Sequence, residues 1–226
     1  MGVRLRVVAY NIHSSRDDLT ALASVVRGLA PDILVVQEGP RRFRWRTKAA
    51  ELARSFGLVY AGGGLPSLGN VIMTNLRVRV REAWDVKLPL KPGRHMRGAA
   101  FARCEVNGVD FTVVGTHLST DGEERPSQAE QIRQAIAGLD GPVILGGDLN
   151  DIPGSVSWGL IHQELVDVAE RVGAGDVYTW PSRGADRRID TIAVSEDVGV
   201  QAYHVETGGR TRAASDHLPL VAELTL

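Results

Sequence analysis

Residues 143–151, with the sequence VILGGDLND, combine groups that could do chemistry. Three apolar residues predict a buried strand, two glycines would let the backbone come close to another group, and carboxylates with an amide follow. Carboxylates held together at a strand end repel one another unless a cation or a proton intervenes. Asp148 and Asn150 alternate across Leu149, so extended backbone would point both side chains the same way. The simpler alternative is a strand that runs into an Asx-rich turn and binds nothing.

Polar side chains recur at the ends of other predicted strands along the whole chain. Besides Asp148 with Asn150, they are Asn11, Glu38, His117, Asp190, and Asp216 with His217. Each has a simpler interpretation as a turn residue, an exposed strand end, a strand cap or a hydrogen-bonded core histidine. Strand ends on one edge of a sheet core converge on a common crevice, and the recurrence favours that interpretation. The carboxylates are hard oxygen ligands that suit Mg²⁺ or Mn²⁺, and no cysteine cluster or HExxH helix indicates zinc.

Hydrophobic periodicity predicts the elements that position these residues. Asp17 or Asp18 caps a first helix, Gly57 ends a second, and Ser127 with Glu130 forms a capping box for a third. Asn107-Gly108 predicts a two-residue hairpin turn. Strands are predicted over 4–13, 33–36 (covered on both faces), 69–73, 77–87, 100–106, 109–117, 143–148, 189–194, 200–205 and 218–224, with a helical turn over 155–162. About ten strands with irregularly spaced helices predict two sheets packed face to face with helices outside.

Composition predicts a single globular domain over residues 1–226. The chain is 43% hydrophobic and 23% charged without a compositional break, which allows a sizeable core. Its net charge of −1 gives no global field for nucleic acid. Cys104, the single cysteine, excludes an internal disulfide and is interpreted as a core residue. No signal peptide or membrane span is recognised, so we expect a cytoplasmic protein.

The ordered motifs identify a resemblance that covers the chain from the first strand to the last. The chain resembles the endonuclease/exonuclease/phosphatase superfamily, which has the deoxyribonuclease-I-like fold. This resemblance implies an α/β four-layer sandwich of two packed mixed β-sheets flanked by helices. The matching segments are Tyr10-Asn11-Ile12, Gln37-Glu38, Gly69-Asn70, Thr116-His117-Leu118, Gly147-Asp148-Leu149-Asn150, Arg188-Ile189-Asp190 and Ser215-Asp216-His217.

The resemblance also implies site roles, and with it Gly146 and Gly147 would leave room for a phosphate. Glu38 would hold Mg²⁺ or Mn²⁺ with Asn11 nearby, and Asp216 would approach this metal or a second one. Asp148 would orient or deprotonate the attacking water, and Asn150 would donate to a phosphoryl oxygen. Asp190 would pair with His217, and His117 would serve as a donor or leaving-group acid. Asn11, Asn70 and Arg97 would contact the substrate, Arg97 by a looser match. Whether Asp148 or the Asp190–His217 pair takes the proton stays open.

These roles predict a divalent-metal-dependent hydrolase of phosphate esters, with a small molecule or lipid headgroup as the first choice of substrate. Basic clusters near the site segments predict a positively charged rim at Arg41 to Arg46, Arg183 to Arg188, and Arg210 with Arg212. Phe43, Trp45 and Trp180 could stack on bases or contact lipid, although core packing or loop anchoring is the favoured interpretation of Trp180, next to Pro181. The alternative is an endonuclease or exonuclease acting on DNA or RNA. A non-catalytic binding module with the same fold is the third hypothesis, and no protein partner is expected.

Overall fold

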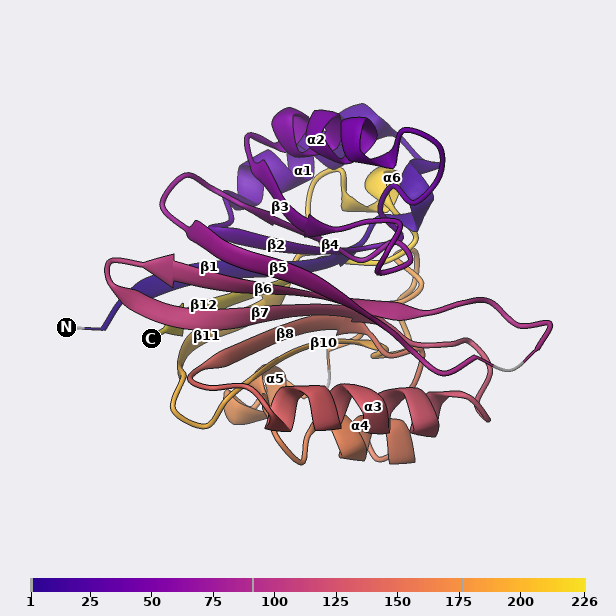
Figure 1. The fold of residues 1–226 in the computed structure, drawn as a ribbon. Helices are drawn as coiled ribbons and strands as arrows, with labels where there is room; N and C mark the ends of the chain where they lie inside the picture. Colours follow the sequence, from indigo (N-terminus) through magenta and orange to yellow (C-terminus); the bar gives the residue numbers. More distant parts are fainter. Residues whose placement is uncertain (1, 91, 176) are drawn as a thin grey trace.

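Two six-stranded mixed sheets pack face to face, and helices cover both outer faces (Figure 1). The computed structural model describes residues 2–90, 92–175 and 177–226. The first sheet has the order β11-β12-β1-β2-β4-β3 and the second the order β5-β6-β7-β8-β10-β9. Helices α1 and α2 lie outside the first sheet, and α3, α4 and α5 lie outside the second (Figure 1). The four-layer α/β sandwich predicted from the sequence is therefore confirmed.

The elements have the following bounds. The first sheet contains β1 (Arg4–Asn11), β2 (Ile33–Gln37), β3 (Val59–Gly63), β4 (Val71–Thr74), β11 (Gly199–Val205) and β12 (Leu220–Thr225). The second contains β5 (Arg79–Lys87), β6 (Gly98–Val106), β7 (Val109–His117), β8 (Val143–Asp148), β9 (Val166–Asp167) and β10 (Asp190–Val194). The helices are η1 (His13–Ser15), α1 (Leu19–Leu29), α2 (Trp45–Phe56), α3 (Arg125–Ala137), α4 (Val156–Ile161), α5 (Val168–Arg171) and α6 (Thr211–Ala214).

Strand register brings the polar strand ends to one edge of the sandwich. In the first sheet β1 is parallel to β2, which places Asn11 beside Gln37, the residue before Glu38. In the second sheet β7 is parallel to β8 and β10 is antiparallel to it, so His117 and Asp190 both pair with Asp148. Parallel strands end at the same edge of a sheet, and this geometry lines up the carboxyl ends of β1, β2, β7 and β8.

Local sequence signals for the element ends are confirmed in most places. The Asp18 carboxylate caps α1 by accepting from the amides of Thr20 (2.8 Å) and Ala21 (3.0 Å). Gly57 ends α2 with a φ of 77°. Asn107 and Gly108 turn the β6–β7 hairpin with φ values of 51° and 83°, as a two-residue turn requires. No helix in the described part of the chain is long and apolar enough to cross a membrane.

The predicted capping box of α3 is wrong. The helix begins at Arg125, so Ser127 lies within its first turn and donates to the Glu124 carbonyl oxygen at 2.9 Å. Glu130 binds Arg133 instead of a backbone amide at the helix start. Pro126 explains the earlier start, because proline fits the first turn of a helix, where the amide needs no partner. The short elements β3, β9 and α5 were not predicted.

Gly146 allows close approach of the two sheets, which corrects the expectation that it leaves room for a phosphate. A Cβ atom there would lie 2.9 Å from Val35 Cβ and 3.0 Å from Ala9 Cβ, inside the core between the sheets. At Gly147 an added Cβ would lie 2.9 Å from Thr116 Cγ2 on the neighbouring strand. Both glycines are therefore needed for packing directly behind Asp148.

We predict that Gly146→Ala destabilises the protein by about 1–3 kcal/mol, because the new methyl group has no space between the sheets. Chemical denaturation with urea would measure the loss. Gly159→Ala is the matched control, because no atom lies within 4 Å of a Cβ at that position in α4. Alanine in a helix should leave stability unchanged or raise it by up to about 1 kcal/mol. Equal stability of the two variants would contradict this account of Gly146.

Candidate active site

Asp148 is the centre of a buried polar cluster at the shared strand edge. Its Oδ2 accepts from Asn11 Nδ2 at 2.8 Å, and its Oδ1 accepts from the backbone N–H of Asn150 at 2.9 Å. Nε2 of His117 lies 3.4 Å from Oδ2, and Nε2 of His217 lies 3.7 Å from the same oxygen. The structure thus brings side chains from β1, β7, β8 and the segment before β12 around one carboxylate.

The backbone after β8 turns sharply and carries Asn150 toward His117. The expectation that extended backbone orients Asp148 and Asn150 alike is wrong, because β8 ends at Asp148 and Asn150 has a φ of 50°. Asparagine tolerates this left-handed conformation better than most residues. The turn nevertheless places the side-chain nitrogen Nδ2 of Asn150 2.9 Å from His117 Nε2. The same Nδ2 donates to the Leu118 carbonyl oxygen at 3.0 Å.

His117 is buried and neutral. Burial lowers its pKa to about 3, which outweighs the opposite effect of the Asp148 carboxylate, and the Arg97 cation lowers it further. Arg97 Nη1 lies 3.2 Å from His117 Nδ1. Because a guanidinium only donates, Nδ1 accepts and the ring hydrogen is on Nε2. The Nε2–H of His117 therefore points toward Asp148 Oδ2, whereas Asn150 Nδ2, itself a donor, is a neighbour of this hydrogen and not its acceptor.

His217 is buried and positively charged. Burial alone would lower its pKa, but the nearby carboxylates of Asp190, Asp148 and Asp216 together raise it to about 10. Nδ1 of His217 lies 3.0 Å and 3.2 Å from the two carboxylate oxygens of Asp190. A charged imidazole donates from both nitrogens, so Nδ1 binds Asp190 and Nε2 faces Asp148. The two histidines beside Asp148 thus differ in charge.

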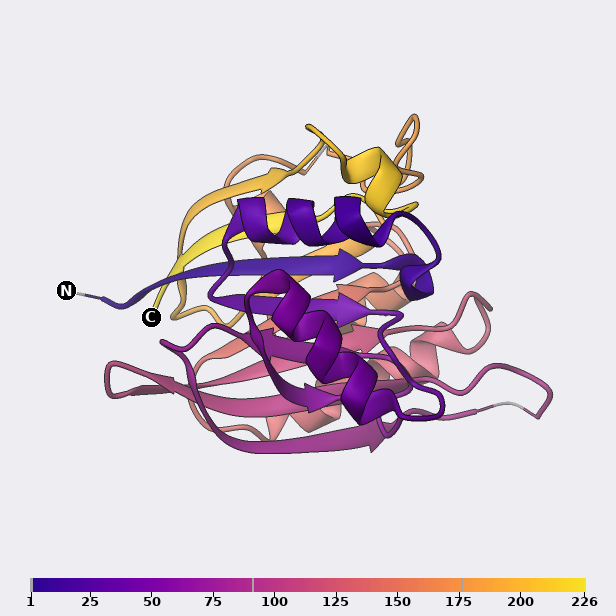
Figure 2. The ribbon, with the colours of Figure 1, turned by 90° about the horizontal axis from the view of Figure 1, so that it is seen from above.

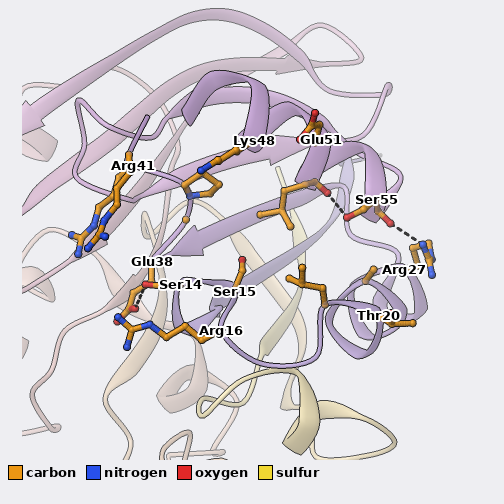
Figure 3. Close-up of a pocket in the computed structure, with 16 residues that line it drawn as sticks. Ser14, Ser15, Arg16, Thr20, Arg27, Glu38, Arg41, Lys48, Glu51 and Ser55 are labelled. Atoms are coloured by element: carbon orange, nitrogen blue, oxygen red, sulfur yellow. Dashed lines mark hydrogen bonds between the residues drawn. The ribbon is translucent and has the colours of Figure 1, made fainter. Parts of the chain in front are cut away.

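Two groups of side chains could hold a cation. Asp148, Asp190 and His217 place ligand atoms within 4.8 Å of one another, and all three residues are buried. Glu38 lies at the outer edge, where its Oε2 accepts from Ser14 Oγ at 2.7 Å (Figure 3). Asp216 is half-buried near this edge, and its Oδ1 lies 3.8 Å from His13 Nδ1. Charged His217 has no lone pair to offer a metal, which favours the Glu38 side of the cluster.

The edge beside Glu38 contains left-handed residues other than glycine. Glu38 has a φ of 57°, and Ser14 in η1 has a φ of 53°. Such backbone costs about 1–3 kcal/mol at each residue and gathers at functional sites. The sequence analysis missed Ser14, and no local signal marks it, because its contact with Glu38 spans 24 positions in sequence.

Arg97 lies against His117, and Asn70 lies beside Gly98, the residue that follows Arg97. Asn70 Nδ2 donates to the carbonyl oxygens of Ser67 and Gly98, both at 2.8 Å, and so ties the loop before β4 to the start of β6. Asn70 Oδ1 and Arg97 Nε are buried and form no hydrogen bond within residues 2–90, 92–175 and 177–226.

The predicted basic rim is wrong at Arg188. This residue is buried, pairs with the Asp167 carboxylate and places its guanidinium 5.1 Å from the centre of the Trp158 ring. Arg188 precedes β10, and its long side chain points inward to fasten β9 and α4. Of the other members of the rim, Arg41 and Trp45 are half-buried and the rest, Arg42, Phe43, Arg44, Arg46, Arg183, Arg187, Arg210 and Arg212, are exposed.

Trp180 lies beside the site at its open edge. Its Nε1 donates to Asp216 Oδ2 at 3.4 Å, and its ring centre lies 6.5 Å from that of His217. Arg187 covers the ring at 5.3 Å. The indole therefore holds Asp216 in place and shields one side of His217.

The four-layer fold and this cluster of acids, amides and histidines agree with the family resemblance of the sequence, and sequence comparison establishes the family. The sequence model of the Endonuclease/Exonuclease/phosphatase family matches residues 8–217. The chain therefore belongs to this family. Family members hydrolyse phosphoesters, generally with divalent metals. No similar sequence was found among curated proteins.

Solved structures share the fold over nearly the whole chain. An endonuclease/exonuclease/phosphatase family protein from Bacteroides thetaiotaomicron is 21% identical, with a TM-score of 0.83 and coverage of 100% of this chain and 99% of that one. A mannosyl-6-phosphatase from the same species is 20% identical, with a TM-score of 0.81 and coverage of 98% and 100%. TDP2 from D. rerio, complexed with a single-strand DNA product, is 20% identical, with a TM-score of 0.80 and coverage of 99% of each chain. At these identities the likeness shows the fold.

Proposed function

We propose that this protein is a Mg²⁺- or Mn²⁺-dependent phosphodiesterase or phosphatase that hydrolyses a small-molecule or lipid-headgroup phosphate ester. The observation that carries the proposal is the placement of Asp148 between neutral His117 and charged His217, with Asn11 bound to the same carboxylate. Hydrolysis by in-line attack needs an acceptor for the water proton and donors for the phosphoryl oxygens. The cluster offers both within one buried edge.

Asp148 orients the attacking water and accepts its proton in this proposal. His217 already carries a proton, held by Asp190, and cannot take a second one. His217 Nε2–H and the Asn150 amide would instead donate to phosphoryl oxygens as negative charge develops on them. His117 contributes its Nε2–H as a neutral donor, because its low pKa leaves no extra proton for a leaving group at neutral pH.

Arg97 and Asn70 would complete the substrate contacts. The guanidinium of Arg97 is buried against His117, and its Nε has no partner in the described residues, so it would offer a donor and a positive charge. The Asn70 amide nitrogen is occupied by two carbonyl oxygens. Its free Oδ1 would accept from a hydroxyl group or a protonated oxygen of the substrate. Arg97 Nε and Asn70 Oδ1 would thus be the atoms that contact the substrate.

Glu38, with Asn11 and Asp216, would hold the divalent cation. The donor set fits, because it consists of carboxylate and amide oxygens, and Glu38 accepts just one hydrogen bond within the described residues. A bound cation would neutralise charge on the phosphoryl and leaving oxygens. Asn11 also binds Asp148, so it would link the cation site to the residue that orients water.

The first test is hydrolysis of generic phosphodiesters, phosphomonoesters and DNA by the purified protein with Mg²⁺, Mn²⁺ or EDTA. We expect hydrolysis with either metal and its loss in EDTA. Glu38→Gln should raise the metal concentration for half-maximal activity by about 10-fold or more, because it removes the charged ligand. Glu82→Gln, an exposed change on β5 in the other sheet, is the matched control. Absence of hydrolysis of every substrate with both metals would reject the proposal.

A nuclease is the second candidate, and the structural neighbour in complex with a single-strand DNA product favours it. Exposed Arg183, Arg187, Arg210 and Arg212 could contact backbone phosphates. Cleavage of DNA or RNA at rates above those for small esters, falling steeply with salt, would place this candidate first. A non-catalytic binding module would instead bind metal and ligand without turnover.

A further inference from the structure

A groove between α1 and α2 opens at Glu38 and extends the candidate site beyond the residues that would do the chemistry. It has a volume of about 770 Å³. Ser14, Ser15 and Glu38 form its inner end, where Figure 3 shows the Ser14–Glu38 hydrogen bond. Arg27 and Ser55 lie at its far end. A ligand bound at the candidate site therefore has direct access to the groove through Glu38.

The two helices leave this space because they meet at their carboxyl ends and diverge toward the site (Figure 2). Near the carboxyl ends, Arg27 Nη1 donates to the Ser55 carbonyl oxygen at 2.8 Å. Toward the amino ends the lining contains the small or polar residues Thr20, Ala23 and Lys48, and the apolar side chains there do not form a continuous ridge that would close the space. The groove therefore results from the side chains that α1 and α2 present to each other.

The lining of the groove is positively charged. Five cations, Arg16, Arg27, Arg41, Arg42 and Lys48, face two carboxylates, a formal balance of +3 on a chain whose net charge is −1. None of the five forms an ion pair within residues 2–90, 92–175 and 177–226, whereas arginines elsewhere, such as Arg77 and Arg125, do. Low-dielectric walls focus such unpaired charge and favour anionic ligands.

The lining also supplies hydrogen-bond donors, some on side chains that make no other hydrogen bond and some on side chains that already donate once to the backbone. The side chains of Arg16, Arg42 and Lys48 make no hydrogen bond to the described part of the chain, so their donors are available. Arg41 donates one hydrogen bond to the Leu68 carbonyl oxygen, and Arg27 donates one to the Ser55 carbonyl oxygen. These bonds hold both side chains in place and leave their positive charge unpaired. Guanidinium forks and ammonium groups together are the chemistry that recognises phosphate.

We propose that this groove binds a second, non-reacting phosphate group of the substrate. The inference rests on the proposed function, since it assumes that the reacting phosphate ester lies at Asp148. Its added content is the substrate class: molecules with at least two phosphate groups, one at the strand edge and one between α1 and α2. A nucleotide strand and a multiply phosphorylated small molecule share this chemistry.

The test measures binding of inorganic pyrophosphate to the metal-free protein in EDTA by titration calorimetry, so that it does not depend on hydrolysis. Arg42→Gln with Lys48→Gln should weaken binding by about 5-fold or more, because two unpaired cations are lost. Arg54→Gln with Arg79→Gln is the matched control, removing two exposed arginines that do not line the groove. It should change the Kd less than twofold.

Equal weakening in the two double variants, or unchanged binding in Arg42→Gln with Lys48→Gln, would overturn the proposal. Thermal unfolding confirms that each variant is folded, and the two single variants replace the double one if it is not. Competition then distinguishes the sources of phosphate. Displacement of pyrophosphate by 5′-phosphorylated tetrathymidylate indicates a strand, displacement by inositol hexakisphosphate indicates a small molecule, and displacement by neither overturns the proposal. Failure of the hydrolysis test alone would leave this binding result intact.

Discussion

Asp148→Asn should lower kcat/KM for phosphate ester hydrolysis by about 10³-fold, within the range lost when a general base is removed. The substitution keeps the size of the side chain and removes the charged acceptor that faces Asn11, His117 and His217. Loss in kcat with a small change in KM is expected, because the carboxylate would act on water and not on substrate binding. Steady-state kinetics with a chromogenic phosphodiester would measure both constants.

Asp140→Asn is the matched control, because Asp140 is exposed and precedes β8 at the opposite end from Asp148. Its kinetics should equal those of the wild type. The metal concentration for half-maximal activity should stay the same in Asp148→Asn if Glu38 holds the cation. Wild-type kcat in Asp148→Asn would remove this residue from the mechanism, and a large rise in the metal requirement would assign it to the metal instead.

Asp190→Asn should reduce kcat by about 10³-fold or more, since loss of the carboxylate that orients a histidine has cost about 10⁴ in other hydrolases. Without the Asp190 charge, burial is opposed only by Asp148 and Asp216, so the pKa of His217 falls and its positive charge at Asp148 is less favoured. Asp186→Asn, an exposed change in the preceding loop, should leave kcat unchanged. Wild-type kcat in Asp190→Asn would reject a role for the pair.

The same substitution should change how stability depends on pH. In the native protein the pKa of His217 is raised from 6.5 to about 10, so between these values the folded state holds a proton that the unfolded state has released. The stabilisation is complete below pH 6.5 and is lost as pH rises through 10, with a maximum slope of about 1.4 kcal/mol per pH unit. Urea denaturation of metal-free protein should show this fall in wild type and a smaller one in Asp190→Asn. Identical slopes would contradict the charged state of His217.

Local signals in the sequence determined the parts of the fold that depend on neighbouring residues. The Asp18 cap, the Gly57 helix end and the Asn107-Gly108 turn all follow from side-chain or backbone preferences within a few residues. The start of α3 was missed because Ser127 and Pro126 are both typical of a helix start and predict different first residues. The helix follows Pro126 and begins at Arg125. Short elements such as β9 carry too few residues to show a period.

The sequence by itself also determined which polar residues end the strands, and hence the acids, amides and histidines of the cluster. Only the tertiary structure decided what they do to one another. Burial and the neighbouring carboxylates give His117 and His217 opposite pKa shifts, although the sequence marks both only as polar residues beside predicted strands. The close approach of the sheets, not a ligand, explains Gly146. The divergence of α1 from α2 creates the basic groove, because packing between distant segments fixes distances that no local pattern records.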